Sequence, residues 1–227
     1  MKFIVIGLGS FGASLAEKLS AQGNEVMGVD NRMEKVNMLK EKITHTICID
    51  ATDEDAFMSL PLKNTDTVIV AIGENEGANI MVTALCKNHF VKRLISRAIN
   101  PLHEKVLLAI GVNEIVHPEQ ETAERWSKKL CLKGLLESFE LNDNYSIIEA
   151  VVPNKYVGKN LLEIGFREKF NILVLTILKE TEQKNIFGTN RMVATVLQGI
   201  PNPKTVIQEG DILALYGSNT DLKYFLK

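Results

Sequence analysis

Three glycines near the start of the chain have the spacing of a phosphate-binding turn. Gly7, Gly9 and Gly12 follow the apolar run at residues 3–6 and precede a helical stretch. In such a turn the first glycine permits a sharp bend, the second lets the backbone approach phosphates, and the third lets the helix pack against the strand. The helix then offers free N–H groups and a partial positive charge to an anion. The pattern predicts a phosphate site, and its alternative is a turn that only packs.

A carboxylate follows where such a site needs one. Asp30 closes the next apolar run, roughly 20 residues beyond the glycines, at the place where an acidic side chain accepts hydrogen bonds from ribose hydroxyls. A carboxylate there repels a 2′-phosphate, so the sequence disfavours NADP. Arg32 is interpreted as a solvated charge, with a weak NADP contact as the alternative. Together the glycines and Asp30 predict that the chain binds an adenine nucleotide.

The elements that must position these residues alternate up to about residue 118. Short apolar runs separated by turn residues from amphipathic stretches are typical of repeated βα units and a parallel sheet. The predicted strands are residues 2–6, 25–30, 44–49, 67–71, 93–97 and 114–117. The predicted helices are residues 11–22, 33–42, 53–60, 76–88 and 101–110. With the glycine turn at the first βα junction, the predicted fold is α/β, a doubly wound parallel Rossmann sheet.

Ligands of such a sheet gather beyond the carboxyl ends of its strands. The turn at residues 50–53 is therefore expected to flank the adenine, and Thr52 or Asp53 could also cap the next helix. Residues 71–75 are expected to cover the ligand from the other side. Arg97 either meets a phosphate or is a surface arginine. The predicted binding residues are Gly7, Gly9, Ser10, Phe11, Gly12, Asp30, Asn31, Arg32, Asp50, Ala51, Thr52, Ala71, Ile72, Gly73, Glu74 and Arg97.

The pattern becomes β-rich after a helical stretch at residues 119–133. Predicted strands cover residues 145–152, 171–178 and 211–217, and a short helix covers residues 219–226. Residues 184–196 are interpreted as a loop or an extra hairpin. We therefore predict a nucleotide-binding domain over residues 1–134 and a second, smaller α+β domain over residues 135–227. The second domain is too small for a typical substrate domain.

The composition excludes several classes of protein. The 227 residues are 45% apolar and 24% charged with a net charge of −2, which is typical of a soluble globular protein. This charge gives no electrostatic case for binding nucleic acid or an anionic membrane. No apolar run approaches the length that spans a bilayer. Cys48, Cys86 and Cys131 are widely spaced and are interpreted as reduced core residues rather than a disulfide or metal site.

Few side chains suit catalysis. Hydride transfer needs an acid or base near the nicotinamide, and His117 is the best of four histidine candidates. We therefore expect no enzyme but a sensor, in which the nucleotide changes shape or assembly. A small NAD-dependent oxidoreductase is the alternative, resting on the glycine motif and Asp30. A redox-sensing DNA-binding repressor is a second alternative, weakened by the net charge and the lack of a basic recognition helix.

The order of these motifs resembles the regulator of potassium conductance (RCK) family. Matching residues in the first part are 4–12, 29–30, 50–53, 70–73 and 115–119, and those in the second are 158–161, 199–203 and 208–213. The resemblance implies a non-catalytic cytoplasmic gating subunit that binds NAD(H) or ATP/ADP. It also implies a membrane potassium-transporting pore subunit as partner, at the inner face of the cell membrane. The subunits would form a homodimer or an octameric ring, with no membrane insertion and no nucleic acid.

The resemblance extends to single residues of the first domain and the helix after it. Residues 119–133 would be the crossover helix that joins protomers, with Trp126 and Leu130 buried between chains; the alternative is the chain's own core. Members that prefer ATP carry an arginine where this chain has Ser10. The resemblance therefore does not decide between NAD(H) and ADP as the ligand. Glu119 matches a carboxylate that holds a divalent cation in some members, or it is a favourable charge at a helix start.

In the second domain the resemblance implies a binding site for a second messenger. Some members bind cyclic di-AMP at the interface of two such domains. The matching residues are Leu161 and Leu162, which would line the bases, and Arg167, which would meet a phosphate.

Overall fold

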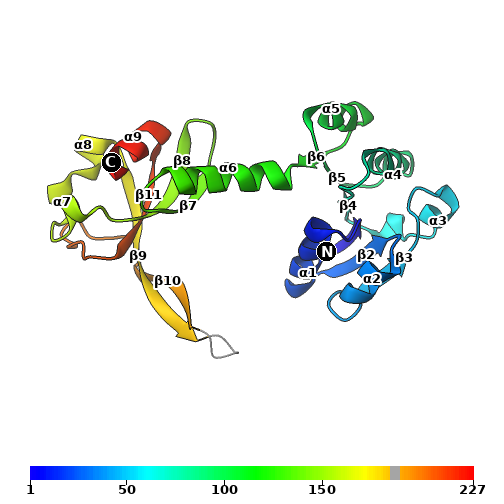
Figure 1. Cartoon of the computed structure of the whole chain (residues 1–227), viewed down its shortest axis with the longest axis horizontal. Helices are drawn as coiled ribbons and strands as arrows, with labels where there is room; N and C mark the ends of the chain where they lie inside the picture. The colour runs from blue at the N-terminus through cyan, green and yellow to red at the C-terminus, as the bar shows by residue number, and fades with distance from the viewer. Residues whose placement is uncertain (185–189) are drawn as a thin grey trace. The chain divides into compact units, whose positions relative to one another are not determined.

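The chain forms two compact units, Met1–Gln120 and Glu121–Lys227, in a computed structural model that describes residues 1–184 and 190–227 (Figure 1). The sequence placed the boundary later, after residue 134. The difference concerns helix α6 (Pro118–Cys131), most of which belongs with the second unit. Near its end, Lys128 and Lys129 form ion pairs with Glu140 and Glu137 of the next strand.

The first unit is the predicted parallel sheet, with strand order β3-β2-β1-β4-β5-β6 and every neighbouring pair parallel. Its strands are β1 (Lys2–Ile6), β2 (Glu25–Asp30), β3 (His45–Cys48), β4 (Thr67–Val70), β5 (Leu94–Arg97) and β6 (Glu114–Val116). Its helices are α1 (Ser10–Ala21), α2 (Met33–Leu39), α3 (Glu54–Met58), α4 (Glu76–Asn88) and α5 (Pro101–Ile110). The strand order reverses between β1 and β4, which creates the switch point where ligands of this fold bind.

The first sheet is buried on both faces. Side chains alternate along a strand, so Ile4 and Ile6 of β1 point to one cluster and Val5 to the other. The cluster around Ile4 includes Phe57 of α3, and the cluster around Val5 includes Ala16 of α1. This continuous burial explains why the strands are apolar throughout rather than alternating. A sheet buried in this way leaves its ends as the places where polar side chains gather.

The three cysteines have different environments. Cys86 of α4 is fully buried, and burial raises the pKa of its thiol to about 12. Cys48 is half-buried, and Cys131 is exposed at the end of α6. The prediction of a core residue is therefore correct for Cys86 and wrong for Cys131, because α6 buries none of its side chains in this chain.

Thiol labelling of the native protein at pH 8 is expected to discriminate these cysteines. Cys131 reacts first, because its thiol is exposed, whereas Cys86 is buried and burial raises the pKa of its thiol to about 12. Cys86 is labelled only as fast as the first unit opens. Peptide mapping by mass spectrometry after timed alkylation measures both rates, and Cys131→Ser removes the fast phase. Rapid alkylation of native Cys86 would contradict its burial.

The second unit is built on an antiparallel sheet of order β10-β9-β11-β8-β7, which confirms the predicted α+β class. Its strands are β7 (Leu135–Glu140), β8 (Tyr145–Val151), β9 (Leu173–Lys184), β10 (Asn190–Gln198) and β11 (Asp211–Ser218). Its helices are α7 (Leu161–Ile164), α8 (Phe166–Phe170) and α9 (Asn219–Leu226). Strands β9 and β10 pair as a hairpin, so of the two interpretations of residues 184–196, a loop or an extra hairpin, the described residues form the hairpin, and residues 185–189 lie outside them.

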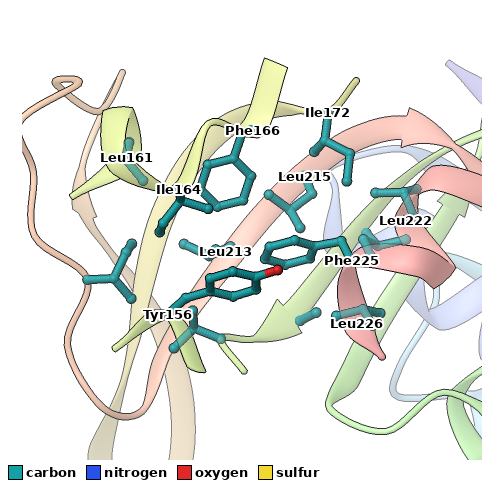
Figure 2. Packing of buried hydrophobic residues seen from close by; sticks show 14 of the residues in the cluster. Tyr156, Leu161, Ile164, Phe166, Ile172, Leu213, Leu215, Leu222, Phe225 and Leu226 are labelled. Carbon is teal, nitrogen blue, oxygen red and sulfur yellow. The ribbon is translucent and has the colours of Figure 1, made fainter. Parts of the chain in front are cut away.

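An aromatic cluster holds the helices of the second unit to its sheet (Figure 2). The rings of Tyr156 and Phe225 stack with their centroids 4.9 Å apart, and the ring centroid of Phe166 lies 5.1 Å from that of Phe225. Leu213 and Leu215 of β11 complete this core from the sheet. Of the helices in the described ranges, none is long and apolar enough to cross a membrane.

Candidate functional site

A pocket of about 340 Å³ opens at the carboxyl ends of the central strands of the first sheet. Its volume lies in the range of small-molecule and cofactor sites. Fifteen of the sixteen predicted binding residues line it: Gly7, Gly9, Ser10, Phe11, Asp30, Asn31, Arg32, Asp50, Ala51, Thr52, Ala71, Ile72, Gly73, Glu74 and Arg97. The exception is Gly12, which shapes the turn without lining the pocket. The fold therefore brings together side chains from five separate strand ends.

Eight further residues line the pocket. Asn75 belongs to the turn at residues 71–75 that was expected to cover the ligand, and Glu119 was predicted separately. The other six were not expected, namely Ile6, Val29, Lys35, Ile49, Ala78 and Val82. Most of these six are apolar ends of strands or the facing side of α4, which any ligand at this edge would touch. Lys35 is different because it brings a positive charge. Its position in the first turn of α2, just beyond Asp30, was the signal that could have identified it.

The three glycines make different contacts. Gly7 has φ +97°, and a Cβ there would lie 2.8 Å from the backbone nitrogen of Ile72. A Cβ on Gly12 would lie 1.9 Å from the carbonyl oxygen of Gly7. Gly9 is open: the nearest atom to its added Cβ is Lys35 Nζ at 3.9 Å. Gly7 and Gly12 therefore build the turn, while Gly9 leaves room in front of it.

Helix α1 begins directly after Gly9, with no side-chain cap on its first turn. The first N–H groups of a helix have no partner within the helix, and here Ser10 and Phe11 of that turn line the pocket. This end of the pocket therefore suits an anion.

Asp30 is held rigidly at the end of β2. Its Oδ2 accepts a hydrogen bond from the Leu8 backbone N–H at 2.7 Å, and its Oδ1 accepts one from the Arg32 N–H at 2.9 Å. Lys35 Nζ lies 3.7 Å from Oδ2. Because an ionised carboxylate has about four acceptor positions, it can still accept from hydroxyl groups in the pocket. Its side chain is only 6% exposed, so this geometry is set by the protein.

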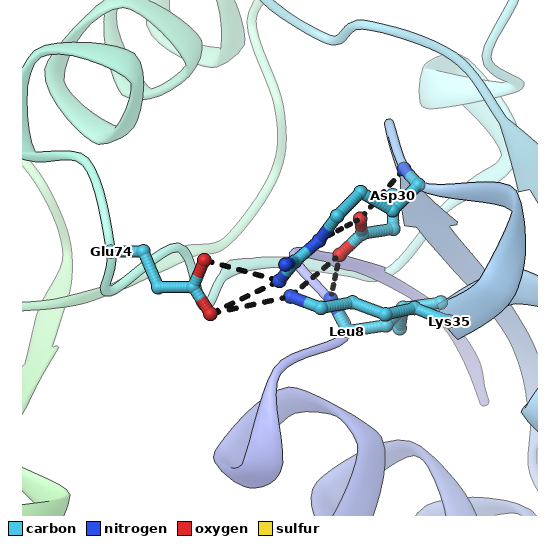
Figure 3. Close-up of polar contacts among 5 residues, drawn as sticks. Leu8, Asp30, Lys35 and Glu74 are labelled. Carbon is cyan, nitrogen blue, oxygen red and sulfur yellow. Dashed lines mark hydrogen bonds and ion pairs between the residues drawn. The ribbon is translucent and has the colours of Figure 1, made fainter.

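Three further charged side chains, Arg32, Lys35 and Glu74, meet beside this carboxylate (Figure 3). Arg32 Nη2 donates to both carboxylate oxygens of Glu74, at 3.0 and 3.1 Å. Lys35 Nζ lies 3.6 Å from Glu74 Oε1, so it bridges Glu74 and Asp30. The charge of Lys35, and then the contact with Arg32, hold the pKa of Glu74 below its ordinary value. The solvated interpretation of Arg32 is incomplete, because its half-exposed side chain has a specific carboxylate partner.

The turn after β3 combines both roles that its sequence suggested. Asp50 Oδ1 accepts from the hydroxyl of Thr52 at 2.7 Å and from its N–H at 3.0 Å. These bonds hold the pKa of Asp50 below its ordinary value. The cap of α3 is Asp53, which accepts from the Ala56 N–H at 3.0 Å. The turn therefore presents residues 50–52 to the pocket and uses the next residue as the cap.

Arg97 lies in the pocket wall rather than on the surface. Its side chain is 16% exposed, and its buried Nε has no hydrogen-bond partner within the described residues. A Cβ on Gly73 would lie 2.1 Å from Arg97 Nη1, so the glycine makes room for the guanidinium. Arg97 Nη2 donates to Glu119 at the start of α6. The alternative of an ordinary surface arginine is therefore wrong.

Two other predicted sites are not assembled by this chain alone. The described residues contain no group of three His, Cys, Asp or Glu side chains that could hold a metal ion, and Glu119 pairs with Arg97. Within its described part, a single chain thus supplies only Glu119 and no further ligand group for a cation there, and the cation at Glu119 stays a prediction. In the second unit Leu161 is buried in the core, whereas Leu162 and Arg167 are exposed. Leu161 cannot line a ligand base as expected, because α7 points this side chain inward.

Comparisons with known proteins agree with this fold. Residues 3–118 match the family model of the TrkA-N domain. The chain is 37% identical over 226 residues to "Ktr system potassium uptake protein C" of Bacillus subtilis (strain 168), covering 100% of this chain and 96% of that protein.

Two solved structures share the fold. The crystal structure of the GsuK RCK domain has a TM-score of 0.64 at 18% identity, over 99% of this chain and 47% of that one. The GsuK channel bound to NAD has a TM-score of 0.65 at 18% identity, over 100% of this chain and 39% of that one. The chain thus spans less than half of either structure. On the family model and the Bacillus relative, the chain belongs to the TrkA-N family, and its resemblance to the RCK family is confirmed.

Proposed function

We propose that this chain is a regulatory subunit of a potassium uptake system, which senses an adenine nucleotide without converting it. One observation supports this most directly: the glycine turn and the fixed Asp30 carboxylate open on the same pocket. The first suits phosphates and the second suits ribose hydroxyls. The relative named a Ktr system potassium uptake protein supports the potassium system.

The ligand is NAD(H) or ATP/ADP. A structural relative is described as bound to NAD, which supports a dinucleotide. The pocket also offers Arg97, with an unpaired Nε–H among the described residues, as a further cation that could meet a phosphate of ADP or ATP. Ser10 adds no charge at the glycine turn. We therefore propose a site that accepts either class.

The proposed partner is a membrane potassium-transporting pore subunit, with the chain on its cytoplasmic side. We also propose that the chain forms a homodimer, or a ring of such dimers, through α6. In this chain α6 buries none of its side chains, while Trp126 is 49% and Leu130 78% exposed. The alternative, that these two residues belong to the chain's own core, is wrong. Exposed apolar side chains on one helix are typical of a protein interface.

Calorimetric titration of the full chain with ATP, ADP, NAD+ and NADH tests the proposed function. Binding of at least one of them with a Kd between micromolar and millimolar is expected, together with a rise in the Tm of the first unit. Light scattering during size-exclusion chromatography is expected to give a dimer or a larger assembly. Absence of binding by all four nucleotides would contradict the proposal.

The oxidoreductase alternative is tested in the same preparation. His117, the best catalytic candidate, lies 3.6 Å from Glu104 and is not one of the residues that line the pocket. We therefore expect no oxidation of NADH with carbonyl substrates above the rate without protein. NADH turnover that is lost in His117→Ala would favour the enzyme over the regulatory subunit.

A further inference from the structure

Glu74 places a carboxylate of the chain itself against the cations of the pocket. Its two oxygens accept from Arg32 Nη2 at 3.0 and 3.1 Å, and Oε1 lies 3.6 Å from Lys35 Nζ. All three side chains line the pocket, and Glu74 reaches Lys35 from the loop after β4 (Figure 3). The contact therefore joins the β2–α2 junction to the β4–α4 loop across the pocket.

The other carboxylate near these cations is held differently. Asp30 is 6% exposed and accepts from two backbone N–H groups, so it cannot move without leaving them unpaired. The Glu74 side chain is 75% exposed. Ion pairs with such exposed partners are weak, and they weaken further in salt. Glu74 is therefore the anion that can give way to another anion.

The cations lie next to the turn that suits phosphates. Lys35 Nζ is 3.9 Å from the position of a Cβ on Gly9, and the Lys35 side chain is only 17% exposed. A phosphate in front of Gly9 would thus come under the same positive charge that Glu74 now neutralises. Its lowered pKa keeps Glu74 ionised at neutral pH. The more negative charge the ligand brings, the more it gains from the cations and the more Glu74 repels it.

We propose that Glu74 determines selectivity among nucleotides by charge: it competes with ligand phosphates for Arg32 and Lys35 and so disfavours ATP, and then ADP, relative to AMP and NAD+. The inference rests on the proposed nucleotide site and deepens it. It makes Glu74 a specificity-determining residue. Removing its charge is then expected to raise the affinity for each nucleotide by an amount that grows with the negative charge of that nucleotide, rather than by the same amount for all.

Calorimetry of the full chain with ATP, ADP, AMP and NAD+, at low ionic strength and without divalent cations, tests this. In Glu74→Gln the Kd for ATP is expected to fall about three- to fivefold, with a smaller fall for ADP and less than about twofold for AMP and NAD+. This difference between the effects on ATP and on NAD+ is expected to shrink at high salt, because salt screens an exposed charge such as that of Glu74. The matched control is Glu76→Gln, which removes the same charge only two residues along the chain. The Glu76 side chain does not line the pocket, and it accepts a hydrogen bond from Asn100. It is expected to leave all four Kd values unchanged.

The outcomes separate the inference from the function on which it rests. If the wild-type chain binds none of these four nucleotides and no NADH either, the proposed function is overturned and the inference with it. If it binds but Glu74→Gln changes all four affinities equally, or no more than Glu76→Gln does, only the inference is overturned. A double-mutant cycle adds a second readout: in an Arg32→Gln background the effect of Glu74→Gln on ATP is expected to shrink.

Discussion

Gly12→Ala is expected to destabilise the first unit by about 2 kcal/mol or more. The added Cβ would lie 1.9 Å from the carbonyl oxygen of Gly7, a backbone atom that no rotamer change can move. Overpacking of this kind costs roughly 3 kcal/mol, whereas alanine within α1 gains only about 1 kcal/mol in helix propensity. Hydrogen exchange of the β1 amides during urea titration measures the loss. The only tryptophan, Trp126, lies in α6, so its fluorescence would not report on this unit.

Gly9→Ala is the matched control for that substitution. Its Cβ has no neighbour closer than 3.9 Å, and Gly9 has φ −70°, which alanine adopts without strain. We expect a change in stability of less than about 1 kcal/mol but a loss of nucleotide affinity of at least about tenfold, because the methyl group occupies the space in front of the turn. Equal stability of the two variants would contradict the separate roles assigned to Gly9 and Gly12.

Asp30→Ala is expected to abolish most nucleotide binding and to destabilise the first unit. The substitution leaves the buried Leu8 N–H without its acceptor and removes a partner of Lys35. An unpaired buried donor costs about 1–3 kcal/mol, and lost charged hydrogen bonds to a ribose reduce affinity by roughly 10- to 100-fold. Thermal unfolding and calorimetric titration with the ligand that the wild type binds measure the two effects.

Asp30→Asn separates the two effects of that substitution. The amide keeps the shape of the side chain and one acceptor for the Leu8 N–H, so the loss of stability is expected to be smaller than in Asp30→Ala. Affinity is still expected to fall, because the amide has fewer acceptor positions for hydroxyl groups. If the alanine variant bound nucleotide as tightly as the wild type, Asp30 would have no part in the site.

Most of the pocket could be predicted because its residues stand at the ends of strands. In a parallel sheet the carboxyl ends meet at one edge, so Asp30, Asp50 and Gly73 must come together once the strands are recognised. The residues that sequence reasoning missed lie in helices or inside apolar strand ends. Lys35 is the instructive case: its position in the first turn of α2 places it near Asp30, but only the folded chain shows that its side chain lies beside Gly9.

The same limit explains the two errors about burial. Cys86 and Cys131 occur in similar apolar surroundings along the chain, yet one is buried and the other exposed. Helix α4 packs on the sheet, whereas α6 buries none of its side chains in a single chain. Leu161 and Leu162 are neighbours, but only the first points into the core of the second unit. Whether a face is covered depends on what packs against it, and the local pattern does not contain that information.

The fold class, the glycine turn and the acid that follows it can all be derived from the amino-acid sequence. These features depend on short-range rules: apolar runs that alternate with amphipathic stretches, a bend that only glycine permits, and a fixed number of residues between the glycine turn and the acid that ends the next strand. The arrangement of charges in the pocket, by contrast, is established only when the chain folds. Arg32 and Glu74 are far apart in the chain. Arg97 at the end of β5 likewise pairs with Glu119 at the start of α6, with α5 and β6 between them in the chain. Such pairs form only where folded loops bring side chains within a few ångströms, because Coulomb attraction between exposed charges is too short-ranged in water to arrange them beforehand.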